Sequence, residues 1–176
     1  MPLPEDLILR EATAADAEAL SSLGSESFVA TFGHLYSARD LQTFLDKTHS
    51  PRAVAAELAA PGRVYRLAES GGALAGYAKL VLACGWPDHA RGHAVVEMRH
   101  LYTAPALTGH GIGTVLMDWA LAEARARGAD EMQLSVWSEN FGAQRFYARY
   151  GFEKLADIQY RVGEQLDDEF LFAKLL

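Results

Sequence analysis

The chain has 176 residues, half of them hydrophobic, and a formal net charge of -7 at pH 7. This length suits one domain with its own core, and the acidity disfavours nucleic acid and mildly favours a cationic substrate. The single cysteine, Cys84, excludes an internal disulfide, and with no leader segment and no apolar stretch long enough to cross a bilayer we expect a cytoplasmic protein without a membrane partner.

Apolar periodicity and turn residues predict a series of strands and helices along the whole chain. The expected elements are a strand at 7–11, helices at 14–32, 37–48 and 51–60, strands at 63–70, 73–83 and 93–103, and then helix, strand, helix, strand, strand. Three helix starts carry capping signals, namely Thr13 with Asp16, Ser37 with Asp40, and Ser50 before Pro51.

The alternation of strands and helices after residue 93 predicts a mixed α/β sheet. It requires the strand that ends at Thr103 to run parallel to the strand at 132–137, because a helix crosses over between them. No repeat or linker interrupts the pattern, so residues 1–176 are expected to form a single domain.

A glycine-rich loop follows the strand that ends at Thr103. Gly109, Gly111 and Gly113 allow the backbone to approach a ligand without a Cβ in the way. The loop leads directly into a helix, whose first N–H groups have no partner within the helix. That helix is marked by an apolar stripe made of Ile112, Val115, Leu116, Trp119 and Ala120. We therefore predict a site for an anion, such as a phosphate, at the loop.

Two common phosphate-binding loops do not fit this segment. A nucleotide P-loop needs a lysine after its last glycine, and Thr114 follows Gly113. The dinucleotide fingerprint G-x-G-x-x-G would need a glycine at position 114, and it normally opens the first strand-helix-strand unit, whereas this loop starts beyond residue 100.

A second distinctive segment, 136–152, reads as a strand followed by N-x-x-A-x-x-F-Y-x-x-x-G-F. Asn140 and Tyr147 are seven residues apart, or two helical turns, which predicts that both project from the same face. Gly151 is placed to terminate the helix.

These two segments together resemble the GNAT N-acetyltransferase family. In that family a strand ending near Leu-Tyr-Val precedes a pyrophosphate loop, which matches Leu101-Tyr102-Thr103 and Gly111-Ile112-Gly113 here. Thr108 stands where the family usually has Gln or Arg, which leaves more of the pyrophosphate contact to backbone amides. The resemblance implies a central mixed, twisted sheet of about seven strands flanked by helices, with a splayed strand pair that holds acetyl-CoA.

The resemblance also implies which residues bind acetyl-CoA and which perform the chemistry. The cofactor-binding residues would be Leu101, Tyr102, Thr103, Thr108, Gly109, His110, Gly111, Ile112, Gly113, Thr114, Asn140 and Tyr147. A backbone N–H near residues 99–101 would stabilise the oxyanion. Tyr147 would protonate the departing thiolate, since phenol and thiol pKa values normally differ by only about one to two units. The alternative is a core tyrosine on an apolar helix face, which the accompanying Asn140 and Gly-Phe end disfavour.

The base that deprotonates the acceptor amine is the least uniform part of the family, and a water chain can replace it. Glu97 is our candidate, because several members carry a carboxylate near this point. The period of two predicts that Glu97 shares a face with Arg99 and Leu101, and that His100, the reserve base, points to the opposite face. The alternative is an ordinary solvated or arginine-paired glutamate.

The expected function is transfer of an acetyl group from acetyl-CoA directly to a primary amine. Segments 160–172 and 76–80 are similar to bacterial polyamine (spermidine/spermine) acetyltransferases, which favours a small cationic amine. The alternatives are a protein or peptide N-acetyltransferase, an antibiotic or other small-amine acetyltransferase, and a non-catalytic acetyl-CoA-binding module. The protein would be a monomer or homodimer.

Other chemically attractive residues are expected to play no catalytic part. His89 and His93 are separated by Gly92 in a segment that a proline opens, so we expect no metal site there. The aromatic cluster that begins at Phe28 and Phe32 and ends at Tyr36 is either core packing or a lid over the acceptor site.

Overall fold

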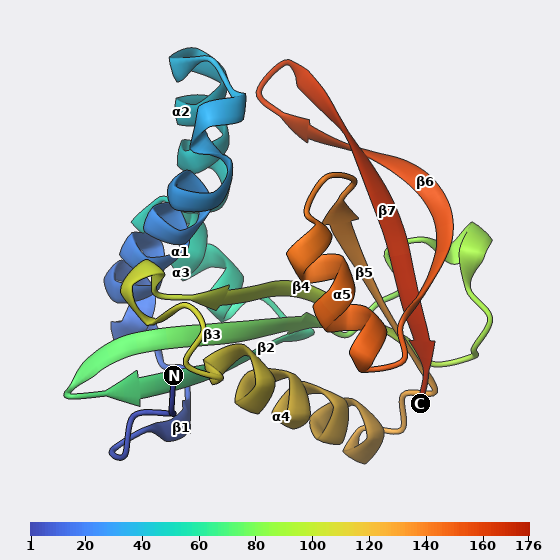
Figure 1. Ribbon diagram of the computed structural model, residues 1–176, viewed down its shortest axis with the longest axis horizontal. Helices are drawn as coiled ribbons and strands as arrows, with labels where there is room; N and C mark the ends of the chain where they lie inside the picture. Colours follow the sequence, from blue (N-terminus) through green and yellow to red (C-terminus); the bar gives the residue numbers. More distant parts are fainter.

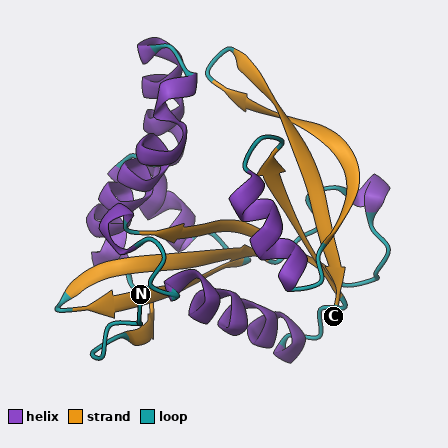
Figure 2. Cartoon of the chain, viewed as in Figure 1, coloured by secondary structure: helices purple, strands orange, loops and turns teal.

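The computed structural model describes residues 1–176, which form one mixed sheet of seven strands with helices against both faces (Figures 1 and 2). The strand order is β1-β2-β3-β4-β5-β7-β6. The main elements are β1 Ile8–Glu11, α1 Ala17–Phe32, α2 Ala38–Thr48, α3 Pro51–Ala59, β2 Arg63–Ser70, β3 Ala73–Val81, β4 Val95–Thr103, α4 Ile112–Ala126, β5 Glu131–Trp137, α5 Phe141–Arg149, β6 Glu153–Val162 and β7 Gln165–Leu175. Every element expected from the sequence is present, and the predicted helix at 14–32 opens with a short 3-10 turn, Ala14–Asp16.

The capping signals operate as the sequence predicts. The Ser37 hydroxyl accepts a hydrogen bond from the Asp40 N–H at 3.1 Å, and Ser50 caps α3 in the same way. Before α1, the Asp16 carboxylate accepts from the Thr13 N–H at 2.7 Å. These contacts satisfy helix N–H groups that have no partner in the helix itself.

Two apolar clusters lie on opposite faces of the sheet. On one face α4 inserts Leu116 and Met117 against Leu80 and Met98 of the strands, and all four side chains are buried. On the other face Leu20 and Leu23 of α1 and Val54 of α3 pack against Leu67 and Tyr77. Figure 1 shows α5 lying over the β5–β7 part of the sheet. No helix is both long enough and apolar enough to cross a membrane.

The predicted parallel pairing between β4 and β5 is confirmed, and it is short. Only three residue pairs are in register, from Val95 opposite Glu131 to Glu97 opposite Gln133. Beyond Glu97 the two strands separate, although β4 stays paired with β3 as far as Thr103 and β5 stays paired with β7 as far as Trp137. The sheet is therefore open between β4 and β5.

A bulge in β4 overturns the prediction about which side chains share a face. Lys79 of β3 lies opposite His100, while the next residue, Leu80, lies opposite Met98, so Arg99 is an extra residue on β4. An extra residue reverses the alternation of faces along a strand. His100 consequently lies on the same face as Glu97, and Leu101 lies on the opposite one, packed against the α4 cluster.

Candidate active site

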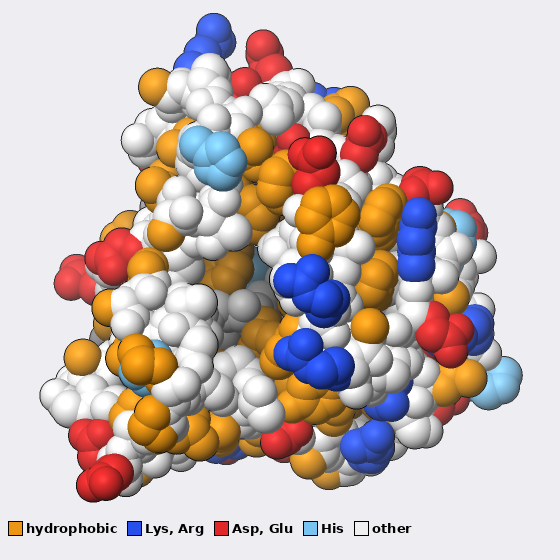
Figure 3. All heavy atoms as spheres, in the orientation of Figure 1, with side chains coloured by type: hydrophobic (Ala, Val, Ile, Leu, Met, Phe, Trp, Pro, Cys, Tyr) orange, Lys and Arg blue, Asp and Glu red, His pale blue; other side chains and the backbone are white.

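A cleft of about 650 Å³ opens where β4 and β5 separate. Its walls come from α1, α2, β4, the glycine loop, β5, α5, β6 and β7. Figure 3 shows this hollow with hydrophobic side chains inside it and Lys or Arg side chains along one border. We name its two parts by their lining residues. The loop end is lined by Thr108, Gly113, Asn140 and Ala143, and the aromatic end by Phe28, Phe32, Phe44, Trp137 and Tyr160.

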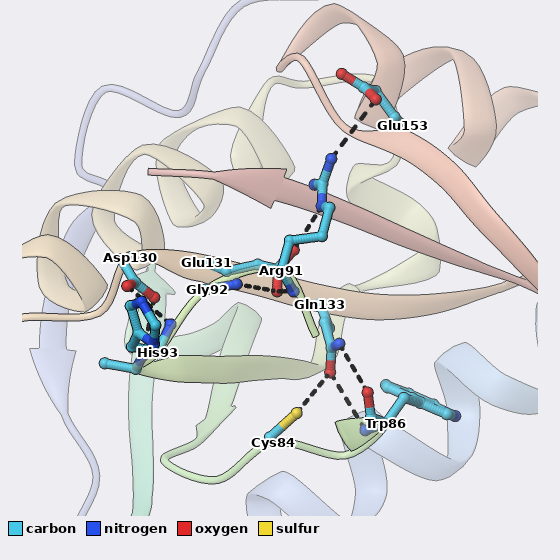
Figure 4. A network of polar contacts seen from close by, with 10 residues as sticks. Cys84, Trp86, Arg91, Gly92, His93, Asp130, Glu131, Gln133 and Glu153 are labelled. Atoms are coloured by element: carbon cyan, nitrogen blue, oxygen red, sulfur yellow. Dashed lines mark hydrogen bonds and ion pairs between the residues drawn. The ribbon is translucent and has the colours of Figure 1, made fainter. Parts of the chain in front are cut away.

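A network of polar contacts fixes the closed side of the sheet, where β4 and β5 still pair (Figure 4). The fully buried Glu131 accepts hydrogen bonds from the backbone and side chain of Arg91, both at 2.8 Å. Gln133 accepts from the Trp86 N–H and donates to its carbonyl oxygen. Both acceptor residues lie on β5, and both partners lie on the loop between β3 and β4. The network therefore ties this loop to β5 beside the point at which the strands part.

Backbone groups dominate the loop end. Gly109 and Gly111 have φ values of 85° and 82°, a left-handed conformation that favours glycine. Gly111 caps α4 without a side-chain hydrogen bond, so the first N–H groups of α4 are left to a ligand or solvent. Such a helix end attracts anions through both its N–H groups and its dipole.

The structure places the predicted cofactor-binding residues in two sets. Those that line the cleft are Leu101, Tyr102, Thr103, Thr108, Gly113, Asn140 and Tyr147. Those that do not line it are Gly109, His110, Gly111, Ile112 and Thr114. Ile112 has its side chain in the core, and His110 Nδ1 lies 3.1 Å from the carbonyl oxygen of Pro2. This second set can reach a ligand in the cleft mainly through its backbone.

Tyr147 lies on α5 and faces the cleft. Its ring packs against Phe146 and Phe152, with centroids 5.5 and 5.9 Å away, and its hydroxyl has no hydrogen bond within the protein. Burial raises the pKa of the Tyr147 phenol to about 12, and the charge of Glu169 acts in the same direction. The phenol is therefore protonated at neutral pH and free to donate a hydrogen bond into the cleft.

Asn140 differs from the expectation that it projects from α5 beside Tyr147. It precedes the helix as its N-cap, and its side-chain oxygen accepts from the Ala143 N–H at 3.2 Å. The side chain lines the cleft while it holds the first turn of the helix that carries Tyr147. The seven-residue spacing did not reveal this, because a cap residue lies outside the helical repeat.

Glu97 and His100 both line the cleft from β4. Glu97 is buried, and its two oxygens accept hydrogen bonds from the Arg99 guanidinium at 2.9 and 2.7 Å. His100 Nδ1 lies 3.0 Å from the Tyr77 hydroxyl, and its ring stacks on Tyr102 with centroids 5.0 Å apart. Burial holds the pKa of His100 well below its usual value, so this ring is neutral at pH 7.

The aromatic end joins parts of the chain that are distant in sequence. Phe28 of α1 packs on Phe44 of α2 with centroids 4.3 Å apart, and Phe32 meets Trp137 of β5 at 6.0 Å. Core packing, one of the two roles expected for these aromatic residues, is observed for Phe28, which is buried in a core cluster, and both phenylalanines also line the cleft. Tyr160 of β6 continues this wall.

The β6–β7 hairpin closes over the aromatic end by contacts with α2 and the turn before it. The Glu164 N–H donates to the Asp40 carboxylate at 2.9 Å. The Tyr36 hydroxyl donates to the Asp167 carboxylate. In Figure 1 the turn of this hairpin approaches the end of α2. The cleft is consequently covered at this end by a segment from the last part of the chain.

Sequence reasoning missed Glu169, a residue of β7 that lines the cleft. One of its carboxylate oxygens, Oε2, is buried and has no hydrogen-bond partner. Burial raises the pKa of Glu169 to about 7, the charge of Asp167 adds to the rise, and the Ser135 side chain opposes it. The signal in the sequence is weak because Asp167, Asp168 and Glu169 are consecutive, and alternation alone does not tell which of them faces a ligand.

No group of three or more His, Cys, Asp or Glu side chains is arranged to hold a metal ion. Cys84 is a free thiol whose Sγ lies 3.5 Å from the side-chain oxygen of Gln133, in the network of Figure 4.

Comparison with known proteins gives consistent matches over nearly the whole chain. The sequence model of the acetyltransferase (GNAT) family matches residues 25–152. An uncharacterized N-acetyltransferase of Lactobacillus delbrueckii subsp. lactis is 28% identical over 159 residues, which cover 88% of this chain and 89% of the relative. The aminoalkylphosphonate N-acetyltransferase of Salmonella typhimurium is 32% identical over 154 residues, or 88% of each chain.

Solved structures share the fold. The PaiA N-acetyltransferase of Thermoplasma acidophilum, in complex with coenzyme A, superposes with a TM-score of 0.79 at 21% identity, covering 97% of this chain and 99% of that one. A ribosomal-protein-alanine N-acetyltransferase of Brucella melitensis gives a TM-score of 0.68 at 22% identity, covering 96% and 99%.

Proposed function

This chain belongs to the acetyltransferase (GNAT) family, and we propose that it acetylates a small cationic primary amine such as a polyamine. Family membership makes it an acetyl-CoA-dependent N-acetyltransferase. Bound acetyl-CoA supplies a thioester, whose carbonyl carbon an amine can attack. The observation that carries the proposed acceptor class is the cleft itself, which combines aromatic walls with two carboxylates, Glu97 and Glu169, in a protein of net charge -7.

The residues at the loop end suit the pyrophosphate of acetyl-CoA. The glycine loop exposes backbone, and a Cβ added at Gly113 would come no closer than 3.9 Å to Phe146. Unpaired N–H groups at the start of α4 can donate to phosphate oxygens. Thr108 lines the cleft with a short side chain where a longer Gln or Arg would reach further, so the backbone carries most of the contact.

The open edge of β4 supports an oxyanion site. Once β5 has separated, the N–H groups of β4 that point towards β5 have no strand partner, and the bulge at Arg99 lies in this stretch. A preorganised backbone N–H stabilises the negative charge that develops on a carbonyl oxygen under attack. We assign this role to an N–H among residues 99–101.

Tyr147 is the proposed acid for the leaving thiolate. With a pKa of about 12, its phenol is further from an ordinary thiol than the sequence suggested, because burial favours the neutral phenol. Complete proton transfer from Tyr147 is therefore harder than expected. A hydrogen bond from the phenol to the departing sulfur, strengthening as charge develops there, still lowers the barrier.

Glu97 is the sequence's candidate for the base, and its surroundings limit that role. Both of its oxygens already accept from Arg99, so a proton from an amine would have to compete with a charged guanidinium. Glu97 could serve as base only if this ion pair loosens when the acceptor binds.

A thiol-release assay with a panel of amines tests the proposed function. We expect turnover with spermidine or spermine to exceed turnover with a peptide amine, because aromatic walls and two carboxylates line the cleft. Coenzyme A, but not ATP or NADH, should raise the melting temperature. At about a hundred times its dissociation constant a ligand stabilises the fold by roughly 2.7 kcal/mol. A peptide acetylated faster than every small amine would contradict the proposed acceptor.

An aminoalkylphosphonate belongs in the same panel as a second candidate. The Salmonella relative carries that substrate in its name, and Arg99 places a guanidinium on the cleft wall that could pair with a phosphonate. Arg99→Gln separates the two classes, since it should impair an anionic amine more than a polyamine.

A further inference from the structure

Glu169 and Glu97 are the two carboxylates that line the cleft, and they differ in their hydrogen-bond partners within the protein. Both oxygens of Glu97 are bonded to Arg99. Glu169 leaves Oε2 buried and without a partner, and no salt bridge involves this residue. A buried acceptor with no donor is costly to keep, and it points to a donor that arrives with a ligand.

Glu169 lines the same cleft as Tyr147, and its neighbour on β5, Trp137, belongs to the aromatic end. In the sheet it lies opposite Trp137 of β5 and opposite Ile158 of β6. Tyr147 and Tyr160 line the same cleft, and the charge of Glu169 adds to the effect of burial in raising the pKa of both phenols. An amine bound in the cleft would therefore share this space with the Glu169 carboxylate.

The groups around Glu169 favour proton uptake. Burial of the carboxylate raises the pKa of Glu169 to about 7, against the Ser135 side chain, which lowers it, and Asp167, two residues away on β7, adds to the rise by charge repulsion. The cation on the cleft wall, Arg99, is occupied by Glu97. A carboxylate in this state can take a proton from an ammonium group and pass it to solvent at neutral pH.

We propose that Glu169 is the general base that deprotonates the acceptor ammonium, an inference that rests on the proposed function. One proton moves from the ammonium nitrogen to Glu169 and then to solvent. The neutral amine attacks the thioester carbonyl, so a C–N bond forms and the C–S bond breaks. The attacking nitrogen is then cationic, and it loses its second proton to solvent as the C–S bond breaks. The coenzyme A thiolate, which accepts a hydrogen bond from Tyr147, gains a proton from that phenol, and solvent returns one to Tyr147. The net products are the amide, the free thiol and one proton released to solvent.

Glu169→Gln tests this proposal, because it keeps the shape of the side chain and removes the base. In the wild type kcat/KM should rise with pH along a limb with an apparent pKa near 7. The variant should lose at least about a hundredfold in activity at pH 7 and regain about tenfold per pH unit as the free amine becomes abundant. Coenzyme A should still raise its melting temperature.

Glu97→Gln is the matched control, a carboxylate of the same cleft. It should retain the limb near pH 7 whatever its effect on the rate. If Glu97→Gln loses that limb while Glu169→Gln keeps it, the proposal is overturned and Glu97 is the base. A wild-type protein that acetylates no amine in the panel would instead refute the proposed function, an outcome separate from either variant's behaviour.

The pH dependence of stability gives a second measurement that needs no activity. The folded-state pKa of Glu169 is raised above its unfolded value, so the native state binds more protons and stability falls as pH rises between about 4.5 and 7. Glu169→Gln should remove this part of the loss in urea unfolding, while Glu97→Gln should not. An identical pH dependence in wild type and Glu169→Gln would overturn the proposal.

Discussion

The loop end and the aromatic end of the cleft are built in different ways. The loop end is one continuous stretch of backbone, in which glycine conformations and the start of α4 present N–H groups. The aromatic end is assembled from side chains of α1, α2, β5, β6 and β7, with Phe28 and Tyr160 more than a hundred positions apart in the chain. A backbone site recognises a group common to many reactions, whereas a side-chain site can differ for each acceptor.

This difference explains why the loop end can be predicted from the sequence and the aromatic end cannot. A backbone site leaves a local pattern of glycines and a helix start, which a short segment can reveal. A side-chain site depends on which strands become neighbours, and a single sequence does not display that directly.

The largest effect is expected at Tyr147, where the two ends meet. Tyr147→Phe should lower kcat by about a hundredfold with little change in the affinity for acetyl-CoA, because the phenol acts mainly in the transition state. The melting temperature should hardly change, since the Tyr147 hydroxyl makes no hydrogen bond within the protein. Steady-state kinetics and a thermal melt on the one variant measure both quantities.

Tyr150→Phe, at the residue that caps the C-terminus of the same helix, is the control. The Tyr150 hydroxyl donates to Asp118 at 2.8 Å and does not line the cleft. Its loss should lower the melting temperature slightly and leave kcat near the wild-type value. If Tyr147→Phe behaves like Tyr150→Phe, Tyr147 is a core residue and the catalytic assignment is wrong.

A smaller effect is expected at the loop end, where Gly111 has a φ of 82°. An alanine there costs roughly 1–2 kcal/mol in the left-handed conformation. The loop can avoid this cost in the free protein by leaving the left-handed conformation. Ligand binding must then restore that conformation, so the cost appears as lost affinity. We expect Gly111→Ala to weaken acetyl-CoA binding by about tenfold in a titration, which corresponds to about 1.4 kcal/mol.

Gly128→Ala controls for backbone strain at the other end of α4. Gly128 has a φ of 83°, and a Cβ there would meet nothing within 4 Å. Gly128→Ala should lose stability and keep its affinity for acetyl-CoA, whereas Gly111→Ala should lose affinity. Equal affinities in the two variants would mean that the loop end does not depend on its glycine conformation, and the contrast between the two ends would lose its basis.

The sequence predicted most of the fold because its signals are local. The strands and helices up to β4 were expected near their observed bounds, and the later ones were expected in the observed order. The pairing of β4 with β5 followed from the crossover helix. The side-chain prediction for β4 failed at one residue. The bulge at Arg99 depends on how β3 and β4 align, and it places His100 on the face of Glu97. No local pattern announces such an insertion.

In the candidate site, too, the residues marked by a local sequence pattern were predicted, and those that depend on contacts between distant segments were not. Tyr147 and Thr108 were expected at the cleft and are found there. Glu169 was not expected, because its importance comes from burial and from an unpaired oxygen, which only the packing of β7 beside β5 creates. The aromatic wall likewise arises from contacts between α1, α2 and β5 that are remote in sequence.

The smallest effect is expected at Asn140, and it separates two roles that the sequence could not distinguish. The resemblance makes Asn140 a cofactor-binding residue, whereas its side chain caps α5 by accepting from Ala143. Loss of such a cap costs about 1 kcal/mol, and aspartate caps as well as asparagine. Asn140→Ala should therefore lower the free energy of unfolding in urea by about 1 kcal/mol, while Asn140→Asp should not.

If capping is the main role of Asn140, both variants should bind acetyl-CoA nearly as well as the wild type. If the amide touches the cofactor, Asn140→Asp should instead bind it more weakly than Asn140→Ala, because the added negative charge would face an anionic ligand. That order of affinities would mean that Asn140 binds the cofactor at the loop end and does not act only as the cap of the helix that carries Tyr147.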